Sequence, residues 1–275
     1  MFPLPFTATE YGTYIVEQVI STELLIWSHI PTAIIGIVFA FVLYRLTKKL
    51  SALYLLFLTV TFAIWSYLEL ITWGAPQEDI MFTWSVLDIF GILFTIFTYW
   101  FLYVFVKGTD VSFWQKLVSL TAIIPVYVYT YLGTNLNVYY NPEIIAIESN
   151  LTVNILLVEQ FIFLFVIILF TLNESRKAQN ASERNRIFLG GLGASLFLFI
   201  FAFSYLITNI SLLFGINTVL NESYVAGVYA LFGMPFLVGF MSYLIAKYQA
   251  FDLKLTNSIC FILLLMLILL LSIFI

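Results

Sequence analysis

Three acidic residues fall inside long apolar stretches of the sequence: Glu69, Asp88 and Glu159. A charge that faces lipid at mid-helix costs about 2.5 to 3.5 kcal/mol, so three would cost roughly 8 to 10 kcal/mol, comparable with the whole stability of a domain. We therefore expect these carboxyl groups to face a bundle interior, where they are paired, protonated or able to meet an amine, a cation or a proton. The only histidine, His29, would suit a pH sensor if it paired with Asp88 or Glu159.

Counting residues from the predicted helix ends, at about 1.5 Å per residue, puts these four side chains in the outer half of the membrane. Three further polar residues could reach the same level and complete a ligand-binding pocket that opens outward: Tyr205, Asn209 and Tyr229. A purely structural reading stays open beside this one. Glu69 and His29 lie near enough to the interface to be solvated, and a buried acid is often only hydrogen-bonded to a neighbouring helix.

The composition identifies an integral membrane protein. Hydrophobic residues make up 63% of the chain and charged residues 9%, and the mean hydropathy is +1.05, which is far from the range of water-soluble domains. A membrane-spanning helix needs about 20 apolar residues, and the short alternating strands of a membrane barrel do not occur. We predict an all-α, seven-transmembrane helix bundle over residues 1–250, and a joint with an eighth apolar helix over 251–275. The predicted crossings are 23–46, 51–73, 80–106, 114–132, 152–172, 187–214 and 224–248, with 255–275 as the eighth.

The cations predict the orientation, because Lys and Arg in short loops stay on the cytoplasmic side. All eleven fall in alternate predicted loops, and the other loops hold only acids. We therefore expect the N-terminus outside and residues 243–254 at the cytoplasmic face. Pro31, Pro125 and Pro235 should bend their helices, and the small residues between 190 and 195 should permit close helix packing.

We expect no cofactor, no metal and no catalysis. One histidine and one cysteine cannot assemble a His/Cys metal site, and no glycine-rich phosphate loop occurs. Where a retinal pigment needs a lysine, the predicted seventh helix has Met234, Phe236 and Phe240. No Ser/His/Asp group shares one depth.

The stretch YLIAKYQAFDLK, residues 243–254, separates two apolar runs. It resembles the end of the N-terminal seven-transmembrane region of bacterial sensor histidine kinases. In that region the seventh helix closes with a tyrosine, a basic residue, an aromatic residue and a Phe-Asp-hydrophobic step. The matching positions here are Tyr243, Lys247, Tyr248, Phe251, Asp252 and Leu253.

The resemblance implies a sensor in the bacterial plasma membrane that relays an external or membrane-derived signal through Tyr243, Lys247, Tyr248, Phe251 and Asp252. The partners it implies are the lipid bilayer, a second copy of the chain and a cytoplasmic kinase or signalling protein, with no nucleic acid. The printed sequence has no cytoplasmic histidine helix and no nucleotide-binding domain. We therefore expect either the sensor part of a longer kinase or a solo sensor that works through a partner, without kinase activity of its own.

Two other classes stay open. A small transporter or channel for a cation or an amine is favoured by the intramembrane acids, but the sequence shows no inverted repeat. A receptor of the G-protein-coupled type would share the orientation. Its usual signatures are absent from VFVKGTD, at the end of the predicted third helix, and from GMPFLVGFMSY in the seventh.

Overall fold

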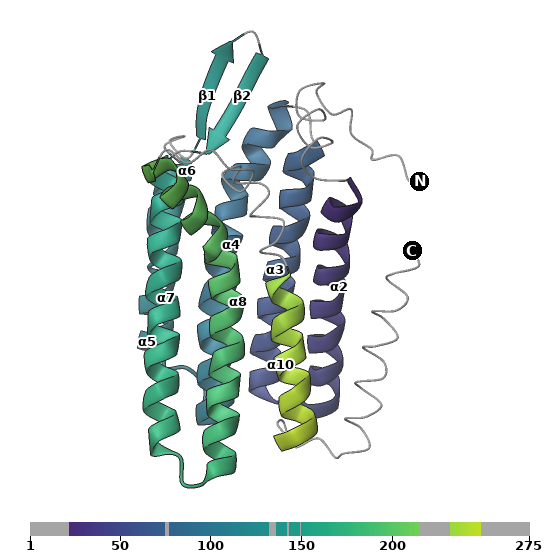
Figure 1. Ribbon diagram of the computed structural model, residues 1–275, viewed down its shortest axis with the longest axis vertical. Helices are drawn as coiled ribbons and strands as arrows, with labels where there is room; N and C mark the ends of the chain where they lie inside the picture. Colours follow the sequence, from purple (N-terminus) through teal and green to yellow (C-terminus); the bar gives the residue numbers. More distant parts are fainter. Residues whose placement is uncertain are drawn as a thin grey trace.

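The computed structural model describes residues 22–74, 77–131, 136–141, 143–148, 150–214 and 232–248. They form a bundle of long helices with a β-hairpin at one end (Figure 1). The helices are α2 (Thr22–Thr47), α3 (Leu50–Gly74), α4 (Gln77–Lys107), α5 (Phe113–Leu120), α6 (Ile123–Tyr131), α7 (Asn150–Lys177), α8 (Ala181–Phe214) and α10 (Gly233–Tyr248).

Five of the described helices, α2, α3, α4, α7 and α8, contain stretches long and apolar enough to cross a membrane. A shorter apolar stretch, Gly233–Ile245, lies in α10. The predicted class, a multi-pass helical membrane bundle, is therefore confirmed. The count of seven crossings stays a prediction, and the eighth helix at 255–275 lies outside the described residues.

The predicted fourth crossing, 114–132, is not the single helix we expected. It is broken between α5 and α6, where the Thr121 hydroxyl donates to the Val118 carbonyl at 2.6 Å and the Ile124 N–H donates to the Thr121 carbonyl at 3.0 Å. The physical reason is Pro125, which has no N–H to offer the Thr121 carbonyl and whose ring crowds that same group. The bend expected at Pro125 is a break in the helix.

A β-hairpin corrects the all-α prediction. Strand β1 (Leu136–Asn141) pairs antiparallel with β2 (Glu143–Glu148), with Leu136 opposite Glu148 and Asn141 opposite Glu143. The hairpin lies between α6 and α7 in the chain and projects from one end of the bundle (Figure 1). Two strands of this length are only marginally stable alone, and they give a weak signal between strongly apolar helices.

The centre of the bundle is aromatic. Trp65 of α3, Phe94 of α4 and Phe201 of α8 are almost fully buried. The Phe201 ring centroid lies 4.7 Å from that of Trp65 and 4.6 Å from that of Phe94, both edge to face. Such pairs contribute about 0.5 to 1.5 kcal/mol beyond their buried area, so these rings hold α3, α4 and α8 together.

Glycines of α8 allow close approach to three other helices, as the small residues predict. A Cβ at Gly190 would lie 2.8 Å from the Phe105 ring, and a Cβ at Gly193 would lie 2.8 Å from Cβ of Phe240. A Cβ at Gly191 would overlap the Thr171 side chain. Backbone-to-side-chain packing this close drives helix association where no hydrophobic effect is available.

All lysines and arginines of the described residues gather at one end of the bundle, opposite the hairpin (Figure 1). Helices α2, α4, α7 and α10 end there, while α3, α5 and α8 begin there. We call this the basic end. Its cations are Arg45, Lys48, Lys49, Lys107, Lys116, Arg176, Lys177, Arg184, Arg186 and Lys247.

Candidate functional site

His29 of α2 faces Glu69 of α3 inside the bundle. Nε2 of His29 lies 3.7 Å from Oε2 of Glu69, and the two side chains are 1% and 12% exposed. This distance is too long for a direct hydrogen bond but allows an ion pair when the imidazole carries a proton. The carbonyl of His29 also accepts hydrogen bonds from the hydroxyls of Thr32, at 3.1 Å, and Ser66, at 3.2 Å. The second bond crosses from α3, so this level of α2 is fastened to α3 by polar contacts.

Asp88 of α4 lies at the same level. Helices α3 and α4 run antiparallel, and a Cβ at Gly91 would lie 3.6 Å from Nε1 of Trp65. One turn beyond Trp65 is Glu69, and about one turn before Gly91 is Asp88, so the two acids share a depth in the α3–α4 interface.

Asp88 is 3% exposed, and its Oδ2 has no hydrogen-bond partner in the described part of the chain. We call His29, Glu69 and Asp88 the acid–histidine cluster. Three ionisable groups from three helices are thus held at one depth, away from the basic end.

Glu159 lies elsewhere, in a cleft that α4, α5, α6 and α7 form. Helices α4 and α7 run parallel, with the Tyr99 and Phe163 ring centroids 6.4 Å apart. We call this space, of about 620 Å³, the Glu159 cleft. Its lining residues are Tyr99, Trp114, Gln115, Val118, Ser119, Thr121, Ala122, Pro125, Glu159, Ile162, Phe163 and Val166.

The structure therefore brings His29 to Glu69, sets Asp88 at their level, and places Glu159 in a separate cleft. The side chains of Tyr205 and Asn209, on α8, and the whole of Tyr229 lie outside the described residues.

The proposed relay residues lie where α10 ends. Nζ of Lys247 is 2.6 Å from the Tyr243 hydroxyl and lies over the rings of Tyr243 and Tyr248, 5.2 and 5.6 Å from their centroids. Phe251 and Asp252 are outside the described residues.

Two polar residues with notable surroundings were not predicted from the sequence. One is Asp110, whose carboxylate accepts hydrogen bonds from Tyr54 at 2.8 Å and Lys116 at 2.7 Å. The other is Gln160, 2% exposed, whose side-chain oxygen has no partner in the described part of the chain. The Ser112-x-x-Gln115 spacing is a capping-box signature that would have located the start of α5 and the loop that holds Asp110.

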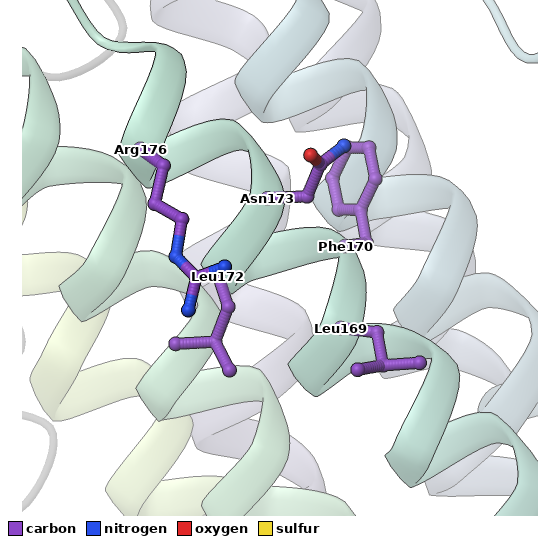
Figure 2. A pocket seen from close by; sticks show the side chains of 5 residues that line it. All are labelled: Leu169, Phe170, Leu172, Asn173 and Arg176. Atoms are coloured by element: carbon purple, nitrogen blue, oxygen red, sulfur yellow. The ribbon is translucent and has the colours of Figure 1, made fainter.

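A smaller hollow, of about 440 Å³, lies on α7 near the basic end and is lined by Leu169, Phe170, Leu172, Asn173 and Arg176. Figure 2 shows the Arg176 side chain reaching back along the helix toward Leu172. All five residues belong to one helix, so the hollow is a surface feature of α7 and is not enclosed by neighbouring helices.

Among the described residues, no group of three His, Cys, Asp or Glu side chains could hold a metal ion. Comparison of the chain with protein-family models, curated proteins and solved structures finds no match.

Proposed function

We propose that this chain is a membrane-embedded signal-sensing module whose input is a proton at the acid–histidine cluster. The observation that carries the proposal is the buried 3.7 Å approach of His29 to Glu69, with Asp88 at the same depth. Ionisable side chains inside a membrane bundle are costly, and they typically mark ion pathways, proton relays or ligand counter-ions.

The cluster gives a proton a structural effect. A neutral His29 makes only a polar contact with Glu69, whereas a protonated His29 makes an ion pair across the α2–α3 interface. In a low-dielectric interior such a change alters the attraction between the two helices more than it would in water. A proton at Asp88 would likewise neutralise a carboxyl group whose Oδ2 has no hydrogen-bond partner in the described chain.

Contacts between helices connect this input to α10. A Cβ at Gly36, two turns beyond His29 on α2, would lie 3.1 Å from Cγ of Met234 on α10. From Met234, α10 runs to Tyr243, Lys247 and Tyr248 at the basic end. Displacement of α2 against α3 would therefore press directly on the helix that carries the proposed relay residues.

The proposal includes the orientation and the seven crossings predicted from sequence, with the N-terminus outside and the basic end in the cytoplasm. It also includes the resemblance of residues 243–253 to the closing segment of histidine-kinase sensor regions. A cytoplasmic kinase or signalling protein is the output partner this role requires, and a homodimer is the assembly in which such sensors would work.

The test is hydrogen exchange of the α10 amides in nanodiscs at several pH values, corrected for the intrinsic pH dependence of exchange. We expect protection of residues 243–248 to change with pH in the unmodified protein and the change to be lost in His29→Gln and Asp88→Asn. Glu159→Gln is the matched control, since Glu159 lies in the Glu159 cleft and not in the acid–histidine cluster, and it should keep the response. A response that is absent in the unmodified protein, or unaltered in both cluster variants, contradicts the proposal.

Transport of a proton or cation is the second candidate. It is favoured by Oδ2 of Asp88 and Oε2 of Glu159, which are buried without hydrogen-bond partners in the described chain. Purified protein in liposomes should dissipate a proton or cation gradient if it transports. A sensor should leave the gradient intact while still showing the pH response in α10.

A further inference from the structure

The Glu159 cleft is separate from the acid–histidine cluster and has its own chemical character. Its volume of about 620 Å³ falls within the ~300–1,000 Å³ of typical small-molecule sites. Helices α5 and α7 flank the cleft, and their side chains form its walls: Val118 on α5, and Ile162 and Phe163 on α7. The break between α5 and α6 also borders it, because Thr121, Ala122 and Pro125 line the space.

Glu159 is the sole acid among the described residues that line the cleft, and none of these residues carries a positive charge. Its Oε2 is buried and has no hydrogen-bond partner in the described chain. A buried carboxylate oxygen without a donor carries a large desolvation penalty. A ligand that brings both a positive charge and an N–H donor to this oxygen would offset the desolvation penalty.

The remaining surface selects for an apolar body. Aromatic rings of Tyr99 and Trp114 and aliphatic side chains of Val118 and Ile162 dominate the walls. Trp114 is 71% exposed, Val118 68% and Ile162 55%, which marks this side of the bundle as facing the bilayer. An amphiphile dissolved in the membrane would reach the cleft without first crossing water.

We infer that the Glu159 cleft binds a hydrophobic primary or secondary amine, whose ammonium donates to Glu159 while its alkyl or aryl body lies against α5 and α7. The donor requirement defines the class. A protonated primary amine offers three N–H donors, whereas a quaternary ammonium has the charge but no donor, and an alcohol has a donor but no charge.

The test uses purified protein in phosphatidylcholine nanodiscs, with empty nanodiscs to subtract partition into lipid. The probes are octylamine, 1-octanol and octyltrimethylammonium at neutral pH, and the readout is saturable binding. We expect octylamine to bind about tenfold or more tightly than either analogue, because each lacks part of a charge-assisted hydrogen bond.

Two variants localise the site. Glu159→Gln keeps the shape of the side chain and should weaken octylamine binding about tenfold or more. Val118→Trp should fill the cleft and weaken binding while leaving Glu159 in place. Asp88→Asn is the matched control, and it should bind octylamine as the unmodified protein does.

Several results overturn the inference. They are a lack of saturable octylamine binding, equal binding of 1-octanol or octyltrimethylammonium, or undiminished binding in Glu159→Gln. Unaltered binding in Val118→Trp would overturn the assignment to this cleft even if Glu159→Gln fails to fold. Because the pH response of α10 is measured without an amine, this site and the proposed sensing function stand or fall separately.

Discussion

The hydroxyl of Tyr54 on α3 donates a 2.8 Å hydrogen bond to Oδ1 of Asp110 in the connection between α4 and α5. The Val111 N–H donates to the same oxygen at 2.8 Å, and Nζ of Lys116 donates to Oδ2 at 2.7 Å. The Lys116 ammonium also lies over the rings of Tyr54 and Trp100, 5.5 and 5.8 Å from their centroids. One carboxylate thus fastens the start of α5 to α3 at the basic end.

Asp110→Asn should lower the stability of this connection in a pH-dependent way. Burial by itself raises the pKa of Asp110, but the hydrogen bonds from Lys116 and Tyr54 and the charge of Lys116 more than offset burial, so the pKa lies below its usual value. The carboxylate therefore stabilises the fold above the pKa of the unfolded chain, about pH 4, and this contribution is lost as the pH falls through the folded pKa.

We expect Asp110→Asn to lower the free energy of unfolding at neutral pH by about 0.5 to 1.5 kcal/mol, a modest loss because the side chain is 49% exposed and solvent screens the ion pair. The melting temperature of Asp110→Asn should also fall less steeply with decreasing pH than that of the unmodified protein. Tyr54→Phe, the comparison, removes one of the hydrogen bonds that lower the pKa of Asp110, so it should keep the part of the acid sensitivity that depends on Lys116. Identical acid profiles for Asp110→Asn and the unmodified protein would refute this account.

Gly191→Ala should destabilise the contact between α7 and α8. A Cβ at Gly191 would overlap the Thr171 side chain, whose hydroxyl donates to the Ile167 carbonyl at 2.7 Å. Overpacking of this kind costs about 1 to 3 kcal/mol. Gly239→Ala on α10 is the matched control, because its added Cβ meets nothing within 4 Å, and it should be neutral or stabilising by up to about 1 kcal/mol. Thermal unfolding of both variants in one detergent checks the contrast, and equal melting temperatures would argue against the close α7–α8 packing.

Glu174 should couple more strongly to Lys107 than to Lys177. Its Oε2 lies 2.6 Å from Nζ of Lys107 on α4, and its Oε1 lies 3.0 Å from Nζ of Lys177 on its own helix. Lys107 is 36% exposed and Lys177 60%, so solvent screens the second pair more. Double-mutant cycles with Glu174→Gln should give a coupling of up to about 1 kcal/mol for Lys107→Met and about 0.3 to 0.5 kcal/mol for Lys177→Met. The reverse order would mean that α7 is not fastened to α4 by this pair.

Pro125→Ala should extend α5 toward α6. Alanine supplies an N–H that can reach the Thr121 carbonyl and removes the ring that crowds it. We expect amide hydrogen exchange at residues 122–124 and 126 to slow by about tenfold or more, as the turn between α5 and α6 becomes helical. Pro235→Ala on α10 is the comparison, and it should leave these amides unaltered. Unchanged exchange at 122–124 and 126 would assign the break to a cause other than Pro125.

Helix class and charge placement follow from sequence because they depend on local rules. Apolar stretches of membrane length appear as α2, α3, α4, α7 and α8. The ends of α2, α3 and α4 lie within three residues of the predicted ones, whereas α7 ends five residues later and α8 begins six residues earlier than predicted. The alternation of basic loops appears as a single basic end (Figure 1). The hairpin between α6 and α7 was not predicted from the sequence, since its strands are short and are held by pairing with each other.

What the sequence by itself determined is that Glu69, Asp88 and Glu159 lie within long apolar stretches, where a charge that faces lipid is costly. Only the tertiary structure decided that His29 approaches Glu69 at 3.7 Å while Glu159 lines a cleft that neither of them borders. The physical reason is that depth along a helix follows from counting residues, whereas the neighbours of a side chain depend on which helices pack together and at what rotation. Contacts such as those of Phe201 with Trp65 and of Gly191 with Thr171 set that packing, and they join residues far apart in the chain.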